Sequence, residues 1–235
     1  MRCHCASYTD VGKRSNNEDS FGLHQSGDSL LAIVADGLGG HENGEVASRL
    51  AVDSIIKDLS EAEIDEDTLL YAILDANKAI CSAKTIGKTT VAALWIKDQY
   101  AVAAHVGDSR IYQFRDGEII FQSVDHSNVQ MAVLVGELEP DALRNHKDRN
   151  QLFRALGEEN EELKVDSTEL EVLPGDSFLL CSDGFWEPVT EEDMLQTLKE
   201  AESPEQWLDA MKQIVVTADK PKQDNYTAVC LQVEL

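Results

Sequence analysis

One segment of the chain, residues 30–48, joins an apolar run to a helical pattern through a turn that holds an aspartate and four glycines. The apolar run, Leu30 to Val34, has the length of a buried strand. Asp36 follows it, and Gly37 begins the glycine turn, whose residues can adopt backbone conformations closed to other residues. Taken alone, the segment fits either a loop with one solvated carboxylate or a cation site shared by Asp36 and a neighbouring carbonyl.

Helical periodicity appears in two parts of the chain. Apolar residues recur at every fourth position over 47–59 and at helical spacing over 69–80, with an acidic linker at 61–67. Capping signals predict two further helices that begin near Thr190 and Ser203. We interpret the apolar stripes of these helices as parts of the core.

Strand-like segments with short turns make up most of the remaining chain. We expect strands at 6–9, 20–24, 90–97, 100–104, 110–114, 118–122, 170–173, 177–181 and 226–233. The two central hairpins turn at Asp98 and Asp116, and we expect them to form one antiparallel meander, interrupted by a polar break at Asp108. Residues 125–162 are weakly periodic, which predicts a surface excursion or lid with a helix near 150–156.

The charge of the chain excludes some partners. The 235 residues carry a formal net charge of -24, and the pI is near 4.4. Such a field repels nucleic acid and anionic lipid and attracts divalent cations. An enzyme of this charge that acts on an anionic substrate needs local positive charge from metals or from a specific arginine.

The five cysteines are odd in number and lie mostly in apolar segments, which argues against a disulfide framework. We therefore expect reduced thiols and a cytoplasmic protein. No apolar run approaches the roughly 18 residues of a membrane span, and we expect no signal peptide.

Acidic residues stand beside several of the expected strand ends. These residues are Asp36, Asp108, Asp183 and Asp224, with Glu18 and Asp19 in a loop between two strands. Because antiparallel sheets bring strand ends together at a rim, the acids could converge into a cage of oxygen ligands. Oxygen ligands without His or Cys favour Mg or Mn over Zn. Two such ions sharing Asp36 would acidify a water that attacks phosphorus in line with the departing oxygen.

Six short motifs in the chain carry a family resemblance. They are Arg14-Ser-Asn-Asn-Glu18-Asp19, Asp36-Gly-Leu-Gly-Gly-His with Gly44-Glu45, Val106-Gly-Asp108-Ser-Arg110, Asp125-His-Ser127, Cys181-Ser-Asp183-Gly and Asp224-Asn-Tyr-Thr227. In this order and spacing they resemble the motif series of the metal-dependent protein phosphatases of type 2C, the PPM family, in its short bacterial form. The resemblance covers essentially the whole chain.

This resemblance implies an α+β fold, a four-layer α-β-β-α sandwich of two antiparallel sheets flanked by helices. It implies one phosphatase domain over 1–235, with a mobile flap around 127–145. The implied substrates are phosphoserine and phosphothreonine in proteins, including a cognate Ser/Thr kinase. We expect a monomer that binds neither nucleic acid nor membranes.

The resemblance also implies roles for the acidic residues and for one arginine. Asp36 would bridge two Mn or Mg ions, the Gly37 carbonyl would bind one of them, and Asp183 with Asp224 would bind the other. Glu18 and Asp19 would hold metal-bound waters, and Asp108 with Asp183 would form a third, weaker metal site. Arg14 would bind the phosphate through a bidentate contact, for which a planar guanidinium is suited. The implied catalytic residues are Arg14, Asp36 and Asp183.

The chain departs from the family pattern at two places. The usual Gly-Thr-Thr appears as Gly87-Lys88-Thr89-Thr90. Eukaryotic members carry a histidine after the Asp-Gly pair, proposed as general acid, where this chain has Leu38. A metal-bound water is then the first candidate for protonating the leaving group, and His41 is the second.

Other motifs favour structural interpretations. Cys3-His4-Cys5 lacks a second ligand pair at finger-like spacing, and Lys88 lacks the upstream glycine of a phosphate loop. His105 and His126 are interpreted as structural. Two alternatives to a phosphatase stay open: a non-catalytic binding module of the same fold, and another metal-dependent hydrolase such as a phosphodiesterase.

Overall fold

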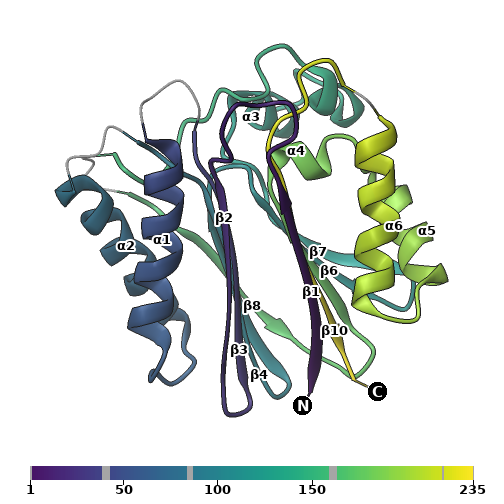
Figure 1. Ribbon diagram of the computed structural model, residues 1–235. Coiled ribbons are helices and arrows are strands. Elements are labelled where there is room, and N and C mark those ends of the chain that lie inside the picture. Colours follow the sequence, from purple (N-terminus) through teal and green to yellow (C-terminus); the bar gives the residue numbers. More distant parts are fainter. Residues whose placement is uncertain (1, 39–42, 84–86, 159–162, 219, 235) are drawn as a thin grey trace.

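Two five-stranded antiparallel sheets lie face to face at the centre of the molecule (Figure 1). The computed structural model describes residues 2–38, 43–83, 87–158, 163–218 and 220–234. One sheet has the strand order β1-β10-β9-β6-β7 and the other has the order β2-β3-β4-β5-β8. Helices cover the outer face of each sheet, which confirms the predicted α-β-β-α sandwich.

The strands of the described chain are short and evenly sized. They are β1 (Cys3–Asp10), β2 (Asp19–Ser26), β3 (Ser29–Asp36), β4 (Val91–Lys97), β5 (Tyr100–Val106), β6 (Arg110–Arg115), β7 (Glu118–Gln122), β8 (Asp166–Glu171), β9 (Ser177–Cys181) and β10 (Tyr226–Val233). The helices are α1 (Gly44–Leu59), α2 (Glu66–Ser82), α3 (Asn128–Leu134), the 3-10 helix η1 (Pro140–Asn145), α4 (Asp183–Trp186), α5 (Glu191–Glu200) and α6 (Pro204–Thr217).

The apolar run that ends at Asp36 is strand β3, and it is buried on both faces. Leu31, Ile33 and Ala35 pack against α1 and α2. Leu30, Ala32 and Val34 pack between the two sheets. Because side chains alternate across a strand, burial of both faces requires a continuous apolar run, which is the pattern seen in the sequence.

The predicted helical stripes are the buried faces of their helices. Ala47, Ala51, Ile55 and Leu59 of α1 are fully buried or nearly so, as are the apolar residues of the 69–80 stripe in α2. On the other sheet, α5 and α6 cover a second outer core that contains Trp207. Thr190 and Asp193 form a reciprocal capping box at the start of α5, and the Ser203 side chain caps α6, as the sequence predicts.

The prediction of one central meander is wrong, because the two hairpins belong to different sheets. Strands β4 and β5 lie in one sheet, whereas β6 and β7 lie in the other. The polar break at 107–109 is the point where the chain crosses between the sheets. Gly107 has φ +104, a conformation that L side chains rarely adopt, so the crossover depends on glycine at this position. The crossover leaves Asp108 at the rim, between the two sheets.

The predicted helix near 150–156 is also wrong. This stretch is extended and irregular, and it makes isolated β-bridges from Leu152 to Ser127 and from Leu156 to Thr89. Leu156 and Ala155 are buried in the core, whereas Phe153 is exposed, so the stretch has no continuous apolar face that a helix could bury. The strand predicted at 170–173 lies earlier, at Asp166–Glu171, because it pairs with β5.

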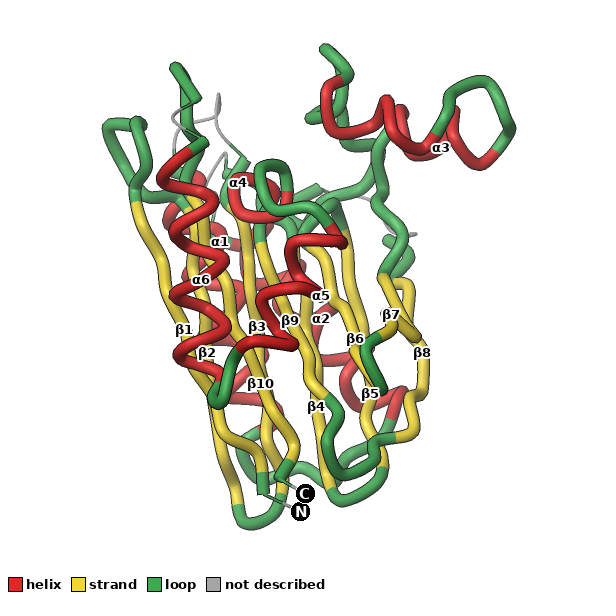
Figure 2. The backbone as a smooth tube through the Cα atoms, turned by 90° about the vertical axis from the view of Figure 1, so that its right-hand side faces the viewer, coloured by secondary structure: helices red, strands yellow, loops and turns green. Residues whose placement is uncertain are grey.

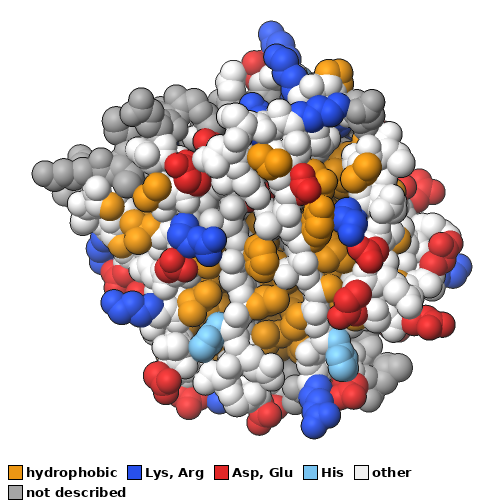
Figure 3. All heavy atoms as spheres, viewed as in Figure 1, with side chains coloured by type: hydrophobic (Ala, Val, Ile, Leu, Met, Phe, Trp, Pro, Cys, Tyr) orange, Lys and Arg blue, Asp and Glu red, His pale blue; other side chains and the backbone are white. Residues whose placement is uncertain are grey.

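The segment 127–145 contains α3 and η1 and lies beyond the strand ends (Figure 2). Figure 1 shows α3, α4 and the β1–β2 connection at the end of the sandwich opposite the two chain termini. Figure 3 shows hydrophobic side chains on the face that carries the edge strands β1 and β2, with charged side chains mostly around its margin. Within the described part of the chain, no helix is long and apolar enough to cross a membrane.

Helix α6 offers a direct test of the packing on the outer face. We expect Met211→Ala to lower the free energy of unfolding by about 3 kcal/mol, because it opens a cavity at a fully buried position. Val216→Ala is the matched control in the same helix, since Val216 is 55% exposed, and its effect is expected to stay within about 0.5 kcal/mol. Urea denaturation measures both, and equal losses would contradict the assignment of the buried face.

Candidate active site

A cleft of about 830 Å³ opens at the rim where the ends of both sheets meet. Most of the predicted site residues line it: Arg14, Glu18, Asp36, Gly37, Asp108, Asp183 and Asp224. Asp19 lies behind this lining and is buried. The structure thus brings together residues that are separated by up to 210 positions in the sequence.

Asp36 and Gly37 are held by hydrogen bonds to the residues just before β4 and β2. The Asp36 N–H donates to Thr90 Oγ1 at 3.0 Å, while the Asp36 carbonyl accepts from the Thr90 N–H at 2.8 Å and from Thr89 Oγ1 at 2.9 Å. The Gly37 N–H donates to the Glu18 carbonyl at 3.1 Å. A Cβ on Gly37 would lie 2.5 Å from the Gly44 backbone, so only glycine fits here. The departure at Lys88 leaves this geometry in place.

Asp19 and Asp36 face each other as cross-strand partners of β2 and β3. The Ser182 hydroxyl donates to Asp19 Oδ2 at 2.7 Å, whereas Asp19 Oδ1 is buried and has no hydrogen-bond partner. A buried carboxylate oxygen without a donor is costly. A cation beside Asp19 and Asp36 would remove this cost.

Asn225 organises the loop that carries Arg14 and Glu18. Its side-chain amide donates to the carbonyls of Val11 and Asn16, at 2.8 and 2.9 Å, and its Oδ1 accepts from the Glu18 N–H at 2.8 Å. These three bonds tie the β1–β2 connection to the start of β10. They place Glu18 and Asp224 on the same side of the cleft.

Asp183 and Asp108 are fixed by a short helix and an aromatic contact. Asp183 begins α4, directly after β9. Trp186 of the same helix donates its Nε1–H to the Asp108 carbonyl at 2.9 Å. The Arg110 guanidinium stacks on Trp186 at 3.6 Å and forms a buried bidentate pair with Asp125, at 2.7 and 2.8 Å. Arg110 is therefore committed to the structure and does not face a substrate.

Burial and mutual repulsion raise the pKa values of the crowded carboxylates. Burial, followed by repulsion from Asp19 and Asp183, raises the pKa of Asp36 well above its usual value. Burial and repulsion from Asp108 raise the pKa of Asp183 in the same way. The pKa of Asp108 rises to about 7 and that of Asp19 to about 6, in both cases mainly through burial.

These carboxylates fit a divalent cation. Burial and mutual repulsion destabilise their charged forms, and a cation between them would reverse both effects. The candidate ligand atoms are all carboxylate or carbonyl oxygens, which are the ligands that Mg or Mn prefers. Asp36, Gly37, Asp183 and Asp224 could ligate such ions directly, and Asp108 adds a carboxylate near Asp183.

Arg14 lies at the mouth of the cleft, where it makes a bidentate contact with Asp224. The guanidinium donates from Nε to Asp224 Oδ1 at 2.8 Å and from its terminal nitrogen to Oδ2 at 2.5 Å. A carboxylate presents two oxygens to the guanidinium much as a phosphate does. The Arg14 side chain is 52% exposed, so an anion that displaced Asp224 could reach the guanidinium.

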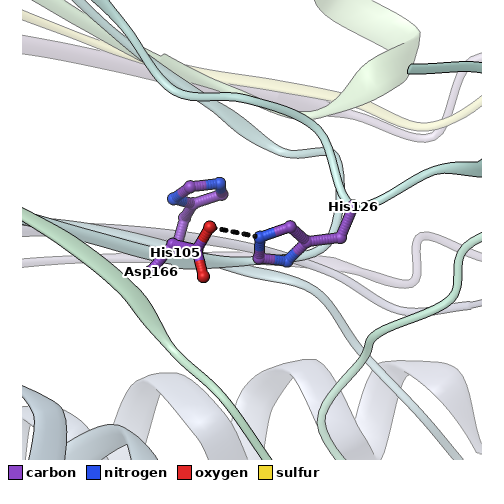
Figure 4. Close-up of side chains that lie close together, drawn as sticks. All are labelled: His105, His126 and Asp166. Atoms are coloured by element: carbon purple, nitrogen blue, oxygen red, sulfur yellow. Dashed lines mark ion pairs between the residues drawn. The ribbon is translucent and has the colours of Figure 1, made fainter. Parts of the chain in front are cut away.

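A second group of potential metal ligands, which do not line the cleft, consists of His105, His126 and Asp166 (Figure 4). His126 Nδ1 accepts the Gly107 N–H at 3.1 Å, so its Nε2 carries the proton and faces Asp166 Oδ2 at 3.2 Å. Arg154 donates to Asp166 Oδ1 at 2.6 Å, and its guanidinium nitrogen lies 3.1 Å from Nε2 of the His126 ring. The guanidinium supplies the positive charge that a metal would otherwise supply here.

This histidine cluster positions the Asp108 corner. His126 binds both polar groups of the Gly107 backbone: its ring Nδ1 accepts the Gly107 N–H, and its backbone N–H donates to the Gly107 carbonyl at 2.9 Å. His105 stacks on the His126 ring at 4.6 Å and contacts the Val124 carbonyl. The structural interpretation of both histidines agrees with these contacts. Cys3-His4-Cys5 lies in strand β1, away from the cleft residues.

Several residues that support the site received no role from the sequence. Thr90, Ser182 and Asn225 hold the acids through hydrogen bonds, and Trp186 holds Asp108. For Ser182, Trp186 and Asn225 the available signal was position, because each stands within a few residues of Asp183 or Asp224, whereas Thr90 is 54 positions from Asp36 and had no such signal. His41 lies outside the described residues.

Known proteins share both the sequence pattern and the fold. The family model for protein phosphatase 2C matches residues 9–225. The chain belongs to the protein phosphatase 2C family. The serine/threonine phosphatase stp of Listeria welshimeri is 34% identical over 248 residues, which cover 99% of this chain and 96% of that protein.

Solved structures agree with this membership of the protein phosphatase 2C family. The serine/threonine phosphatase Stp1 from Staphylococcus aureus has a TM-score of 0.91 and 26% identity, with 100% of this chain and 96% of that chain covered. The catalytic domain of PstP in complex with two manganese ions has a TM-score of 0.85 and 30% identity, with 99% of both chains covered. The chain is a protein serine/threonine phosphatase of a metal-dependent family, which confirms the resemblance inferred from its motifs.

The pH dependence of stability tests the role of His126. Burial, with repulsion from His105, lowers the pKa of His126 to about 4 in the folded chain. An unfolded histidine titrates near 6.5, so the unfolded chain takes up a proton that the folded chain rejects, and stability falls as the pH drops from about 6.5 through 4. In His126→Asn, the asparagine Oδ1 can still accept the Gly107 N–H, but the side chain does not titrate. We therefore expect the loss of unfolding free energy between about pH 6.5 and 4 to be smaller by up to about 3 kcal/mol than in wild type.

The measurement is urea denaturation at several pH values with chelator present. His4→Asn is the control, since His4 is exposed on β1. Parallel curves for wild type and His126→Asn would show that His126 is not held neutral by the fold.

Proposed function

We propose that the chain hydrolyses phosphoserine and phosphothreonine in proteins at the carboxylate rim. The observation that carries this proposal is the convergence of Asp36, Asp183 and Asp224 beside Arg14, from the end of β3, the start of α4 and the segment before β10. A binding module that had lost catalysis would have no reason to keep mutually repelling acids together, because each lowers stability.

Two Mn²⁺ or Mg²⁺ ions are proposed as cofactors. Asp36 would be shared between them, the Gly37 carbonyl would complete one site, and Asp183 with Asp224 would form the other. When bound, such ions acidify water as a nucleophile and neutralise charge on the phosphoryl group. Glu18 and Asp19 would orient water around the ions, and Asp108 with Asp183 would hold a third ion. The two manganese ions in the PstP complex support the proposal of two ions.

Arg14 is proposed to bind the phosphate of the substrate. In the structure its guanidinium binds the Asp224 carboxylate in the two-pronged geometry that also suits phosphate. Use of Asp224 as a metal ligand would free this fork for the substrate. Arg14 would then hold two phosphate oxygens and fix the phosphorus in line for attack.

The proton for the leaving oxygen is proposed to come from water. Leu38 lines the cleft after Gly37, and its aliphatic side chain has no proton to give. Its backbone N–H is already donated to the Lys88 carbonyl at 2.9 Å. Water in a cleft of about 830 Å³ has access to the substrate oxygen without a dedicated side chain.

The proposal also includes a flap, a cellular compartment, the substrates and an oligomeric state. Residues 127–145 would act as a flap on a single domain, because Asn128 lines the cleft while Leu134 and Val135 are more than half exposed. The five cysteines are free thiols, which supports a reducing compartment such as the cytoplasm. The relatives named serine/threonine phosphatase support phosphoproteins as substrates, and we propose a monomer that opposes a Ser/Thr kinase.

The decisive experiment follows hydrolysis with and without metal. We expect the purified chain to hydrolyse p-nitrophenyl phosphate and a phosphothreonine peptide in the presence of Mn²⁺, and chelator to abolish both reactions. A folded chain that binds the phosphopeptide but turns over neither compound would favour the binding module. Turnover of a phosphodiester instead of the monoesters would favour the other hydrolase.

Replacement of one acid tests the metal assignment. We expect Asp183→Asn to lower kcat/KM by about 100-fold or more, because a direct ligand contributes at least as much as its supporting partners. In chelator the variant should be at least as stable as wild type, because it removes a buried, repelled charge. Asp209→Asn on the exposed side of α6 is the control for loss of one negative charge. Full activity of Asp183→Asn would overturn the assignment.

Arg14→Lys separates phosphate binding from general electrostatics. The substitution keeps the charge but loses the bidentate fork, so we expect KM for the phosphopeptide to rise about tenfold. Steady-state kinetics at saturating Mn²⁺ measures the effect. An unchanged KM would show that Arg14 serves only to hold Asp224.

A further inference from the structure

Lys88 stands in the wall of the cleft and has no part in the proposed chemistry. Its carbonyl accepts the Leu38 N–H at 2.9 Å, which places the residue beside the Asp36-Gly37 turn. Its Nζ donates to Glu158 Oε1 at 2.6 Å, and both residues line the cleft. The side chains of Lys88 and Glu158 are 33% and 34% exposed, so the ammonium is accessible from the cleft.

The backbone around Lys88 is rigidly held. Thr89 bridges Gly37 on one side and Leu156 on the other. The Thr89 N–H donates to the Leu156 carbonyl at 3.1 Å, and the Leu156 N–H donates to the Thr89 carbonyl at 2.8 Å. Lys88 therefore starts from a fixed point of the wall, and its side chain extends from there.

Lys88 is a basic residue in a cleft where most of the charged side chains are acidic. Among the described residues that line the cleft, six are acidic: Glu18, Asp36, Asp108, Glu158, Asp183 and Asp224. Two are basic, and each is paired with one of these acids, Arg14 with Asp224 and Lys88 with Glu158. In a chain of net charge -24, Lys88 is thus a local source of attraction for an anionic substrate.

The ion pair with Glu158 leaves Lys88 available for a ligand. A partly exposed pair of this kind contributes about 1 kcal/mol or less, so stability alone gives little reason for it. An ammonium has three N–H donors, and Glu158 accepts from one of them. A substrate anion could use the others, in competition with Glu158 for the positive charge.

We propose that Lys88 is a specificity-determining residue that binds a carboxylate side chain next to the phosphorylated residue of the substrate protein. The inference rests on the proposed phosphatase function and adds a preference to it. The enzyme would favour phosphosites flanked by Asp or Glu over sites flanked by neutral residues. Because the contact is made at an accessible ion pair, the preference would weaken as salt rises.

The experiment compares two phosphothreonine peptides that differ in their flanks. One carries Glu on both sides of the phosphothreonine, and the other carries Gln at the same positions. We expect wild type to show a kcat/KM ratio of about five in favour of the acidic peptide at low salt. Lys88→Ala should bring the ratio to about one, and Lys88→Glu should reverse it.

Two further variants separate substrate contact from a structural role. Glu158→Gln removes the competing carboxylate, so it should raise the ratio, whereas a purely structural ion pair would make Lys88→Ala and Glu158→Gln act alike. Lys97→Ala is the matched control, because Lys97 pairs with Glu63 at 2.8 Å and does not line the cleft. It should leave the ratio unchanged.

The outcomes distinguish the inference from the function on which it rests. Absence of turnover for both peptides and for p-nitrophenyl phosphate would overturn the phosphatase proposal itself. Turnover of both peptides with a ratio of one in wild type, or with the same ratio in Lys88→Ala, would overturn the role of Lys88 alone.

Discussion

Mutual repulsion among buried carboxylates is the constraint around which the rim of this protein is arranged. Asp19 and Asp36 oppose each other across β2 and β3, and Asp183 raises the pKa of Asp36 further. The fold holds these charges together through bonds to the backbone and to small hydroxyls, such as those of Thr90 and Ser182. The unfavourable free energy of this repulsion is offset by the apolar cores on both faces of the two sheets. These cores stabilise the fold away from the rim.

Two arginines show how the molecule separates structural charge from functional charge. Arg110 is buried, paired with Asp125 and stacked on Trp186, so every side of its guanidinium is occupied. Arg14 makes an equally good bidentate contact, but its side chain is half exposed and its partner is a candidate metal ligand. The first pair lies beside the crossover at Asp108, whereas the second is the pair that we propose exchanges its carboxylate for the substrate phosphate.

Local pattern was sufficient for many elements and misleading for a few. The stripe from Ala47 to Leu59 and the run from Leu30 to Val34 predict their elements because burial imposes a period on each. A helix is predicted at 150–156, yet the backbone of this stretch makes hydrogen bonds to Thr89, His126 and Asn128, which are distant in the sequence. The prediction of one central meander is wrong for a related reason. The sequence of the connection between β5 and β6 does not reveal whether the two strands share a sheet.

The sequence by itself determined the acids, their order and the glycine turn, because each lies next to a strand end that periodicity reveals. It also supported the four-layer sandwich and the family through its motif series, which the match over residues 9–225 confirms. Only the tertiary structure decided which supports surround the acids: Asn225 tying the Arg14 loop to β10, His126 holding Gly107, and Lys88 facing Glu158 in the cleft. These contacts join residues far apart in the chain, and no local pattern encodes the distance between them.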